Sequence, residues 1–280
     1  MKENKILISI LVPTYNRVEY LKECLDSIVE QKWFDLRELE LIVSDNSEWD
    51  ETRNFMEKYK KENKDWNIFY NKNKKNLWMV WNWNKLLELK KWEYFIFLSD
   101  DDKFYDKNSL NNLYNEIYNT RTYLCCWKRV FIDKKWETVN DINDFSQAYI
   151  NSTIKYTFDL KNNLLWFGGI LFKKTNIRFE KDVWTAADRC FNLFYLKNFW
   201  SCAFLNKNCF CYRFHDSQLS NRLNVLNLIK NELSIWNKLW IKSYQKFFLF
   251  ARFILAVLYW KILWKFWWKL SLFVKEKLWK

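Results

Sequence analysis

The sequence Tyr94-Phe95-Ile96-Phe97-Leu98-Ser99-Asp100-Asp101-Asp102 joins an apolar run directly to three carboxylates. Aromatic and β-branched side chains suit a covered pleated surface, so the apolar half predicts a buried strand. Folding does not require three adjacent negative charges, which repel one another, whereas a bound divalent cation would account for them because such ions take oxygen ligands. Open α/β sheets place ligands at the carboxyl ends of their parallel strands. The alternative is a solvated acidic turn that merely ends the strand.

Strand-like and helix-like segments alternate on both sides of this stretch. Short apolar runs predict strands, and residues 19–30 have the i, i+3, i+4, i+7 and i+8 apolar spacing of an amphipathic helix. This alternation predicts an α/β fold with a mainly parallel sheet flanked by helices. Strands are expected at 5–12, 39–43, 66–71, 94–98, 123–131, 136–139, 201–205 and 209–214, and helices at 19–30, 52–61, 81–90, 109–119 and 185–198.

The positive charge is concentrated at the C-terminal end. The formal net charge is +13, and residues 226–280 alone hold 11 Lys and Arg against 2 Asp and Glu. The apolar run 247–260 is shorter than the roughly 20 residues that span a bilayer. Lysines recur every fourth residue from Lys261 to Lys269, so we expect 241–280 to form an amphipathic helix on an anionic membrane surface. The alternative is a helix packed on the domain. No recognition motif supports a nucleic-acid partner, and none is expected.

Tryptophan and glycine are present in unusual numbers. The chain has 19 Trp and 2 Gly, whereas average usage gives roughly 7% Gly. Trp49 lies in a turn-like polar cluster, and Trp92 lies where a helix is expected to end and a glycine C-cap is usual. We therefore hypothesise that most of these tryptophans are glycine in the cell, through a genetic code that reads UGA as glycine. The alternative is a protein that is truly rich in tryptophan.

Five short motifs occur in a recognisable order. They are Ser9–Arg17 (SILVPTYNR), Leu41–Ser47 (LIVSDNS), Ser99–Asp102 (SDDD), Ala187–Arg189 (ADR), and Tyr212–His215 (YRFH) with Ser220. In these motifs the chain resembles the family 2 glycosyltransferases, which have the GT-A fold, over roughly residues 5–222. Many members of that family have an aspartate at the position of Ser99, and glycine is usual at the positions of Trp78, Trp81 and Trp92.

The resemblance implies a role for each motif. Ser99–Asp102 corresponds to the DXD region, whose aspartates would hold Mg²⁺ or Mn²⁺ against the donor diphosphate. Asp188 would be the general base that takes the acceptor proton. Arg213 would contact phosphate. The implied metal ligands are Asp102, Asp100 and His215, and the implied nucleotide-binding residues are Pro13, Thr14, Asn16, Arg17, Asp45, Asp100 and Asp101.

A purely structural role remains open for several of these residues. Residues 14–17 also fit an ordinary polar loop after a strand. Asp188 fits the first turn of a helix, where the helix dipole favours a negative charge. His215, the single histidine, also fits a hydrogen-bonded structural role, and Arg213 fits a surface ion pair.

Three segments are expected: a nucleotide-sugar-binding half at 1–105, an acceptor-binding half at 106–225, and a basic helical extension at 226–280. The implied function is metal-assisted transfer of a sugar, with inversion, from a nucleotide-diphosphate donor to a hydroxyl of a cell-envelope glycan, lipid-linked sugar or protein. The expected location is cytoplasmic, peripheral on the inner face of the membrane. One alternative is a nucleotide-sugar-binding protein without catalysis. Another is a basic peripheral membrane or nucleic-acid-binding protein in which the acidic triplet is incidental.

Overall fold

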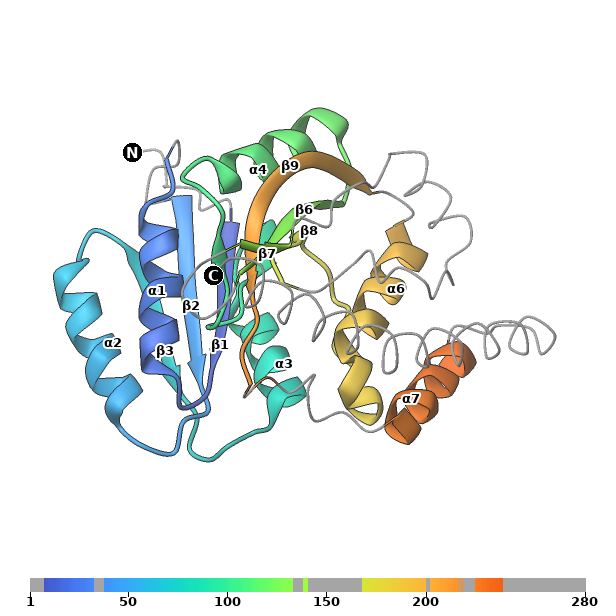
Figure 1. Cartoon of the computed structure of the whole chain (residues 1–280), viewed down its shortest axis with the longest axis horizontal. Coiled ribbons are helices and arrows are strands. Elements are labelled where there is room, and N and C mark those ends of the chain that lie inside the picture. Colours follow the sequence, from blue (N-terminus) through green and yellow to red (C-terminus); the bar gives the residue numbers. More distant parts are fainter. Residues whose placement is uncertain are drawn as a thin grey trace, which may run out of the picture.

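Four parallel strands form the first half of a central sheet (Figure 1). They are β1 (Ile8–Thr14), β2 (Leu39–Asp45), β3 (Asn67–Lys72) and β4 (Tyr94–Phe97), in the order β3-β2-β1-β4. The computed structural model describes residues 8–32, 38–132, 138–140, 168–199, 202–216, 218 and 225–238. In the register of these strands Thr14 pairs with Asp45, and Asp45 pairs with Lys72. The ends of three strands are therefore level at one edge of the sheet.

The second half of the sheet is mixed. Among the described residues the order continues β4-β8-β6-β9-β5, with β7 on β6. Strand β8 is antiparallel to β4. Strands β6 and β9 run parallel to each other, and β5 is antiparallel to β9. The expected α/β fold is confirmed. The bounds of these strands are β5 Lys103–Phe104, β6 Leu124–Ile132, β7 Thr138–Asn140, β8 Leu171–Lys173 and β9 Ala203–Arg213.

Strand β9 corrects one expectation. The sequence predicts two short strands, 201–205 and 209–214, because a polar stretch separates them. The structure has one strand of 11 residues, Ala203–Arg213. Its register with β6 shifts where Trp127 pairs with Leu205, Lys128 with Asn208, and Arg129 with Phe210. The polar stretch is therefore an irregularity of the ladder, and such bulges bend a strand without ending it.

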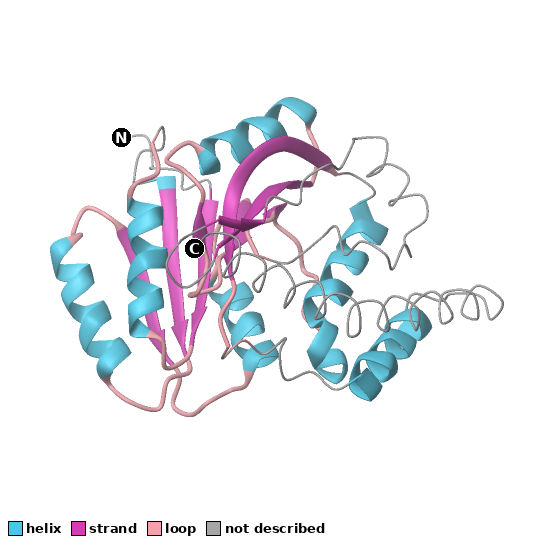
Figure 2. Cartoon of the chain, viewed as in Figure 1, coloured by secondary structure: helices cyan, strands magenta, loops and turns pink. Residues whose placement is uncertain are grey.

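Helices cover both faces of the sheet (Figure 2). On one face α1 (Val18–Val29), α2 (Glu51–Glu62) and α4 (Ser109–Thr120) share a buried cluster with Ile8, Ile10 and Val12 of β1. On the other face α3 (Met79–Leu89) and α6 (Ala187–Phe199) share a second cluster with Leu11. The alternation along β1 follows from the two-residue period of a strand, and it gives the domain three layers.

The C-terminal part of the described chain packs beside α6. The 3₁₀ helix η2 (Lys181–Ala186) precedes α6, and α7 (Val225–Lys238) packs against η2. Lys238 Nζ lies 2.8 Å from a carboxylate oxygen of Glu180. Residues 239–280, which include the expected membrane-binding segment 241–280, lie outside the described part of the chain, and so does Ser220. No helix in the described residues has the length and apolar character needed to cross a membrane.

Candidate active site

The acidic turn after β4 is buried at the carboxyl edge of the sheet. The backbone N–H of Asp102 donates to the carbonyl oxygen of Ser99 (3.0 Å), which makes the turn tight. Asp100, Asp101 and Asp102 are 0%, 8% and 3% exposed, so this is not a solvated turn. Thr14 Oγ1 at the end of β1 donates to Asp100 Oδ2 (2.7 Å). The structure thus brings two of the predicted nucleotide-binding residues together.

Arg17 is the counter-ion of this turn. Its Nη2 lies 2.6 Å from Asp100 Oδ1, and its Nη1 lies 2.6 Å from Asp101 Oδ2. Burial raises the pKa of Asp100 to about 6, although Arg17 opposes the rise. Burial also disfavours the charged form of Asp101, but a hydrogen bond from His215 and the charge of Arg17 outweigh it and lower the pKa of Asp101. Two of the three carboxylates therefore share one arginine.

Asp102 has a different environment. Its Oδ1 accepts a hydrogen bond from the backbone N–H of Arg213 (3.0 Å). A Cβ added at Gly168 would lie 3.3 Å from Asp102 Oδ2 and 3.0 Å from the ring of Phe210. Burial and the neighbouring charge of Asp101 raise the pKa of Asp102 well above its usual value. This carboxylate lacks a cationic partner among the described side chains, and Gly168 packs so closely against it that a larger residue would crowd both Asp102 and Phe210.

His215 and Arg213 bind the turn from the side of β9. His215 Nε2 lies 2.9 Å from Asp101 Oδ2. The guanidinium of Arg213 is buried, where its Nε donates to the carbonyl oxygen of Asp101 (2.9 Å) and its Nη2 forms an ion pair with Glu23. The predicted surface or phosphate contact of Arg213 is therefore replaced by contacts inside the protein. Sequence reasoning missed Glu23, which is 190 residues away in the chain.

The residues present fit a divalent cation, but not as a closed cage. In the described part of the chain, no three His, Cys, Asp or Glu side chains form a group that could hold a metal ion. Asp100 faces Arg17 and His215 faces Asp101, so the expected set of Asp102, Asp100 and His215 is not gathered in one place. Mg²⁺ in nucleotide sites commonly takes only one or two carboxylates and completes its shell with phosphates and water. Among the described aspartates of the turn, Asp102 is the candidate ligand because Arg17 pairs with Asp100 and Asp101 and not with it.

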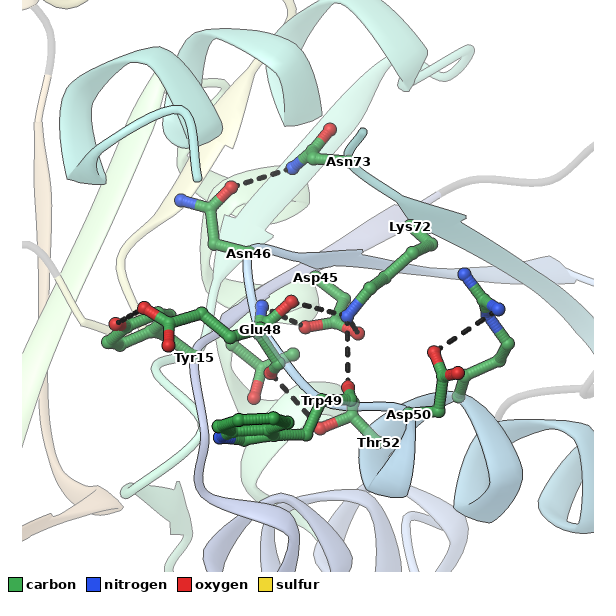
Figure 3. Close-up of polar contacts among 12 residues, drawn as sticks. Tyr15, Asp45, Asn46, Glu48, Trp49, Asp50, Thr52, Lys72 and Asn73 are labelled. Atoms are coloured by element: carbon green, nitrogen blue, oxygen red, sulfur yellow. Dashed lines mark hydrogen bonds and ion pairs between the residues drawn. The ribbon is translucent and has the colours of Figure 1, made fainter. Parts of the chain in front are cut away.

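Asp45 anchors the neighbouring strand ends (Figure 3). Its Oδ1 accepts the backbone N–H of Ser47 (2.6 Å), and its Oδ2 accepts the hydroxyl of Tyr70 (2.6 Å) and Lys72 Nζ (3.2 Å). Lys72 also lines a cavity of about 470 Å³ at this edge. Asp45 is fully buried, so Lys72 stands between it and the cavity. The residues lining the cavity are Ser47, Glu48, Asp50, Arg53, Lys72, Asn73, Lys74, Lys75 and Asn76.

The loop after β1 is fixed to the loop after β2. Asn16 has φ 51°, a left-handed conformation that asparagine tolerates better than most residues. Its backbone N–H donates to Ser47 Oγ (2.8 Å), and its Oδ1 accepts the backbone N–H of Glu48 (3.0 Å). Pro13 lies within β1 opposite Ser44. Asn16 therefore contacts Ser47 and Glu48, which line the cavity beside Asp45, while the next residue, Arg17, contacts the acidic turn.

Asp188 lies in the first turn of α6, as predicted. Its side chain is half-buried, and burial raises its pKa, while backbone N–H groups at the start of the helix oppose the rise. Asn84 of α3 fixes the preceding segment, because it donates to the carbonyl oxygen of Phe179 and accepts its N–H, both at 2.9 Å. Lys181 of η2 lies 5.4 Å from the ring centre of Trp81. These contacts fasten the start of α6 to the helix that follows β3.

Trp78 has a backbone conformation that suits glycine. Its φ is 64° and its ψ is 164°, a region that is essentially restricted to glycine. Its side chain is 75% exposed, and that of Trp49 is 68% exposed. Large apolar side chains in these loops gain little from burial. The geometry at position 78 therefore supports the hypothesis that a glycine occupies it in the cell.

The fold and the buried acidic turn define a GT-A-type α/β domain. Residues 9–181 match the model of glycosyl transferase family 2, and the chain belongs to this family. This confirms the resemblance that the five motifs indicated.

Two solved structures and one sequence relative illustrate the likeness. The structure of Staphylococcus aureus TarS 1-349 in complex with UDP-GlcNAc has a TM-score of 0.67 at 18% identity and covers 91% of this chain and 73% of that one. A mannosyltransferase from Pyrobaculum calidifontis, in complex with GDP-Man and Mn²⁺, has a TM-score of 0.63 at 14% identity, with 91% and 70% covered. A processive diacylglycerol beta-glycosyltransferase from Mycoplasma genitalium is 28% identical over 193 residues, which cover 62% of this chain and 54% of that protein. The chain spans about half the length of the sequence relatives it matches.

Proposed function

We propose that this protein transfers a sugar from a nucleotide-diphosphate donor to an acceptor hydroxyl, with inversion at the sugar and with help from Mg²⁺ or Mn²⁺. The buried turn Asp100–Asp102 carries the proposal, because it places three carboxylates at the edge of the sheet beside Thr14 and Arg17. Relatives of the same fold are known with UDP-GlcNAc, GDP-Man and Mn²⁺ bound, which supports a donor and cation of these classes.

Each group has a defined part in the proposed reaction. A divalent cation, when bound at Asp102, neutralises the diphosphate and stabilises it as a leaving group. The donor nucleotide lies toward the cavity beside Asp45, and Arg17, whose side chain is 31% exposed, is a cation near the turn that solvent reaches. Asp188 takes the proton of the acceptor hydroxyl while the hydroxyl oxygen forms a bond to the anomeric carbon of the donor sugar. The bond from that carbon to the diphosphate breaks, and the diphosphate leaves with the electron pair. One displacement of this kind inverts the configuration.

The acceptor and the location are also proposals. We propose a cell-envelope glycan, a lipid-linked sugar or a protein, with the reaction on the cytosolic side of the membrane. The diacylglycerol named for the Mycoplasma relative supports a lipid among these. Liposome flotation of the full chain and of a chain lacking residues 241–280 tests the membrane part. Equal flotation of the two chains would rule out the basic segment as the anchor.

The catalytic part is tested by nucleotide release. The full chain is incubated with a panel of UDP- and GDP-sugars, with Mn²⁺ or EDTA, and with or without a lipid extract. We expect release that depends on Mn²⁺ and is lost in Asp102→Ala and Asp188→Ala. Asp65→Ala is the control, because Asp65 is an exposed aspartate on another part of the surface. Donor binding without release in any condition would instead indicate a nucleotide-sugar-binding protein without catalysis.

A further inference from the structure

Three side chains behind the acidic turn link it to helix α1. Glu23 and Tyr20 lie three residues apart on α1 and so share one face of the helix. Arg213 at the end of β9 forms an ion pair with Glu23, and its guanidinium carbon lies 4.6 Å from the ring centre of Tyr20. The same ring lies 5.2 Å from the ring of His215. Helix α1 therefore contacts both Arg213, at the end of β9, and His215, in the loop after β9, and both of these residues contact the acidic turn.

Arg213 contacts the turn through its backbone and its side chain. Its N–H donates to Asp102 Oδ1 (3.0 Å), and its Nε donates to the carbonyl oxygen of Asp101 (2.9 Å). These two bonds fix the orientation of the Asp102 carboxylate and the path of the chain that carries it. The β5–β9 pairing, in which Lys103 pairs with Cys211, brings the end of β9 to this point.

The two arginines at the turn, Arg17 and Arg213, differ in their exposure to solvent. The side chain of Arg17 is 31% exposed and can reach a donor, whereas that of Arg213 is 1% exposed and cannot. A guanidinium that solvent does not reach, paired with a carboxylate on α1, can act on the donor only through the residues it holds. This excludes a direct phosphate contact and leaves a role in orientation.

We infer that Glu23, Tyr20 and Arg213 are positioning residues that aim the Asp102 carboxylate at the cation and diphosphate. This role rests on the proposed function, because it requires a cation and a diphosphate to be bound at Asp102. The partners that orient a metal ligand typically contribute tenfold to hundredfold to metal affinity. Loss of the Glu23 charge should therefore weaken cation binding although Glu23 does not touch the cation.

The test measures Mn²⁺ affinity of the full chain by electron paramagnetic resonance, with UDP or GDP saturating in separate arms. We expect Glu23→Gln to raise the Mn²⁺ dissociation constant at least tenfold, and Arg213→Lys to do the same because lysine lacks the Nε donor. Glu19→Gln is the matched control, since Glu19 is an exposed glutamate on the same helix, and it should change nothing. Unchanged Mn²⁺ affinity in folded Glu23→Gln would overturn the inference.

A double variant separates positioning from stability. The pair is buried only on the Arg213 side, because the side chain of Glu23 is 39% exposed. Replacing both members by apolar side chains of similar volume removes the desolvation cost of the guanidinium and leaves no unpaired charge, so Glu23→Met with Arg213→Met should unfold near the wild-type temperature. If the pair positions Asp102, Mn²⁺ affinity stays reduced tenfold or more in this stable protein. If the pair only stabilises the fold, Mn²⁺ affinity recovers together with the melting temperature, and the inference is wrong. A wild-type chain that binds no Mn²⁺ with either nucleotide would overturn metal assistance itself, and the positioning role with it.

Discussion

Replacing Trp78 by glycine should stabilise this protein. Residue 78 has φ 64° and ψ 164°, and a non-glycine residue in such a region costs on the order of 1–3 kcal/mol. Glycine gives back roughly 0.5–1 kcal/mol because it loses more backbone freedom on folding. The indole is 75% exposed, so its removal forfeits little burial. The net expectation for Trp78→Gly is a gain of up to about 2.5 kcal/mol, or up to roughly 10 °C in the midpoint of thermal unfolding.

The assay is urea and thermal unfolding of the wild type, Trp78→Gly and Trp78→Ala. The alanine variant also removes the indole but keeps a Cβ, so it retains the strain and should lie within about 0.5 kcal/mol of the wild type. Equal stabilisation by alanine and glycine would refute the reasoning, because the gain would then come from removing an exposed aromatic ring. The coding sequence gives an independent check: a UGG codon at position 78 contradicts the recoding hypothesis, and UGA agrees with it.

Four further outcomes follow from the site and its supports. Asp102→Asn removes a proposed ligand, so in a titration with UDP or GDP it should weaken Mn²⁺ binding at least as much as loss of an orienting partner does, which is roughly 10–100-fold. Since burial raises the pKa of Asp102, the ionised form is unfavourable in the folded state, and the variant should melt no lower than the wild type at pH 7. Asp188→Asn should lower kcat for transfer by about 10²–10⁴ with little change in donor KM, as steady-state kinetics would show. Because a base must be ionised and burial raises the pKa of Asp188, kcat should fall as pH decreases, with a midpoint above the ordinary 3.8, and a flat profile down to pH 4 would contradict this. Asn84→Ala leaves the N–H and carbonyl of Phe179 without their partner and should lower the free energy of unfolding by about 1–3 kcal/mol in urea.

The local pattern of residues was enough to predict β1 to β4 and α1 to α3, but not the two-residue strand β5. The run Tyr94–Phe97 is apolar because both of its faces are covered, by α1 and α4 on one side and by α3 and α6 on the other. The acidic residues after this strand contact Thr14 because parallel strands end at a common edge of the sheet. This follows from the topology and does not depend on the exact register of the strands. This part of the site was therefore open to prediction from the sequence.

The partners of the charged residues were not open to prediction in this way. The ion pair of Arg213 with Glu23 joins residues 190 positions apart and depends on β5 pairing with β9. The contact of Lys72 with Asp45 depends on the register of β2 against β3, because a shift of one residue would turn Lys72 to the other face. Neither register has a local signature.

The pairing of β5 with β9 has a consequence for engineering. Lys103 and Phe104 belong to the first half of the chain, yet their hydrogen-bonded neighbours, Cys211 and Phe210, come from the second. A chimera that joins the front of this protein to the back of a homologue would replace the strand whose Arg213 contacts Asp101 and Asp102. Such a graft keeps the proposed donor site intact only if the incoming strand carries an arginine at the place of Arg213 and the retained helix still offers a carboxylate to pair with it.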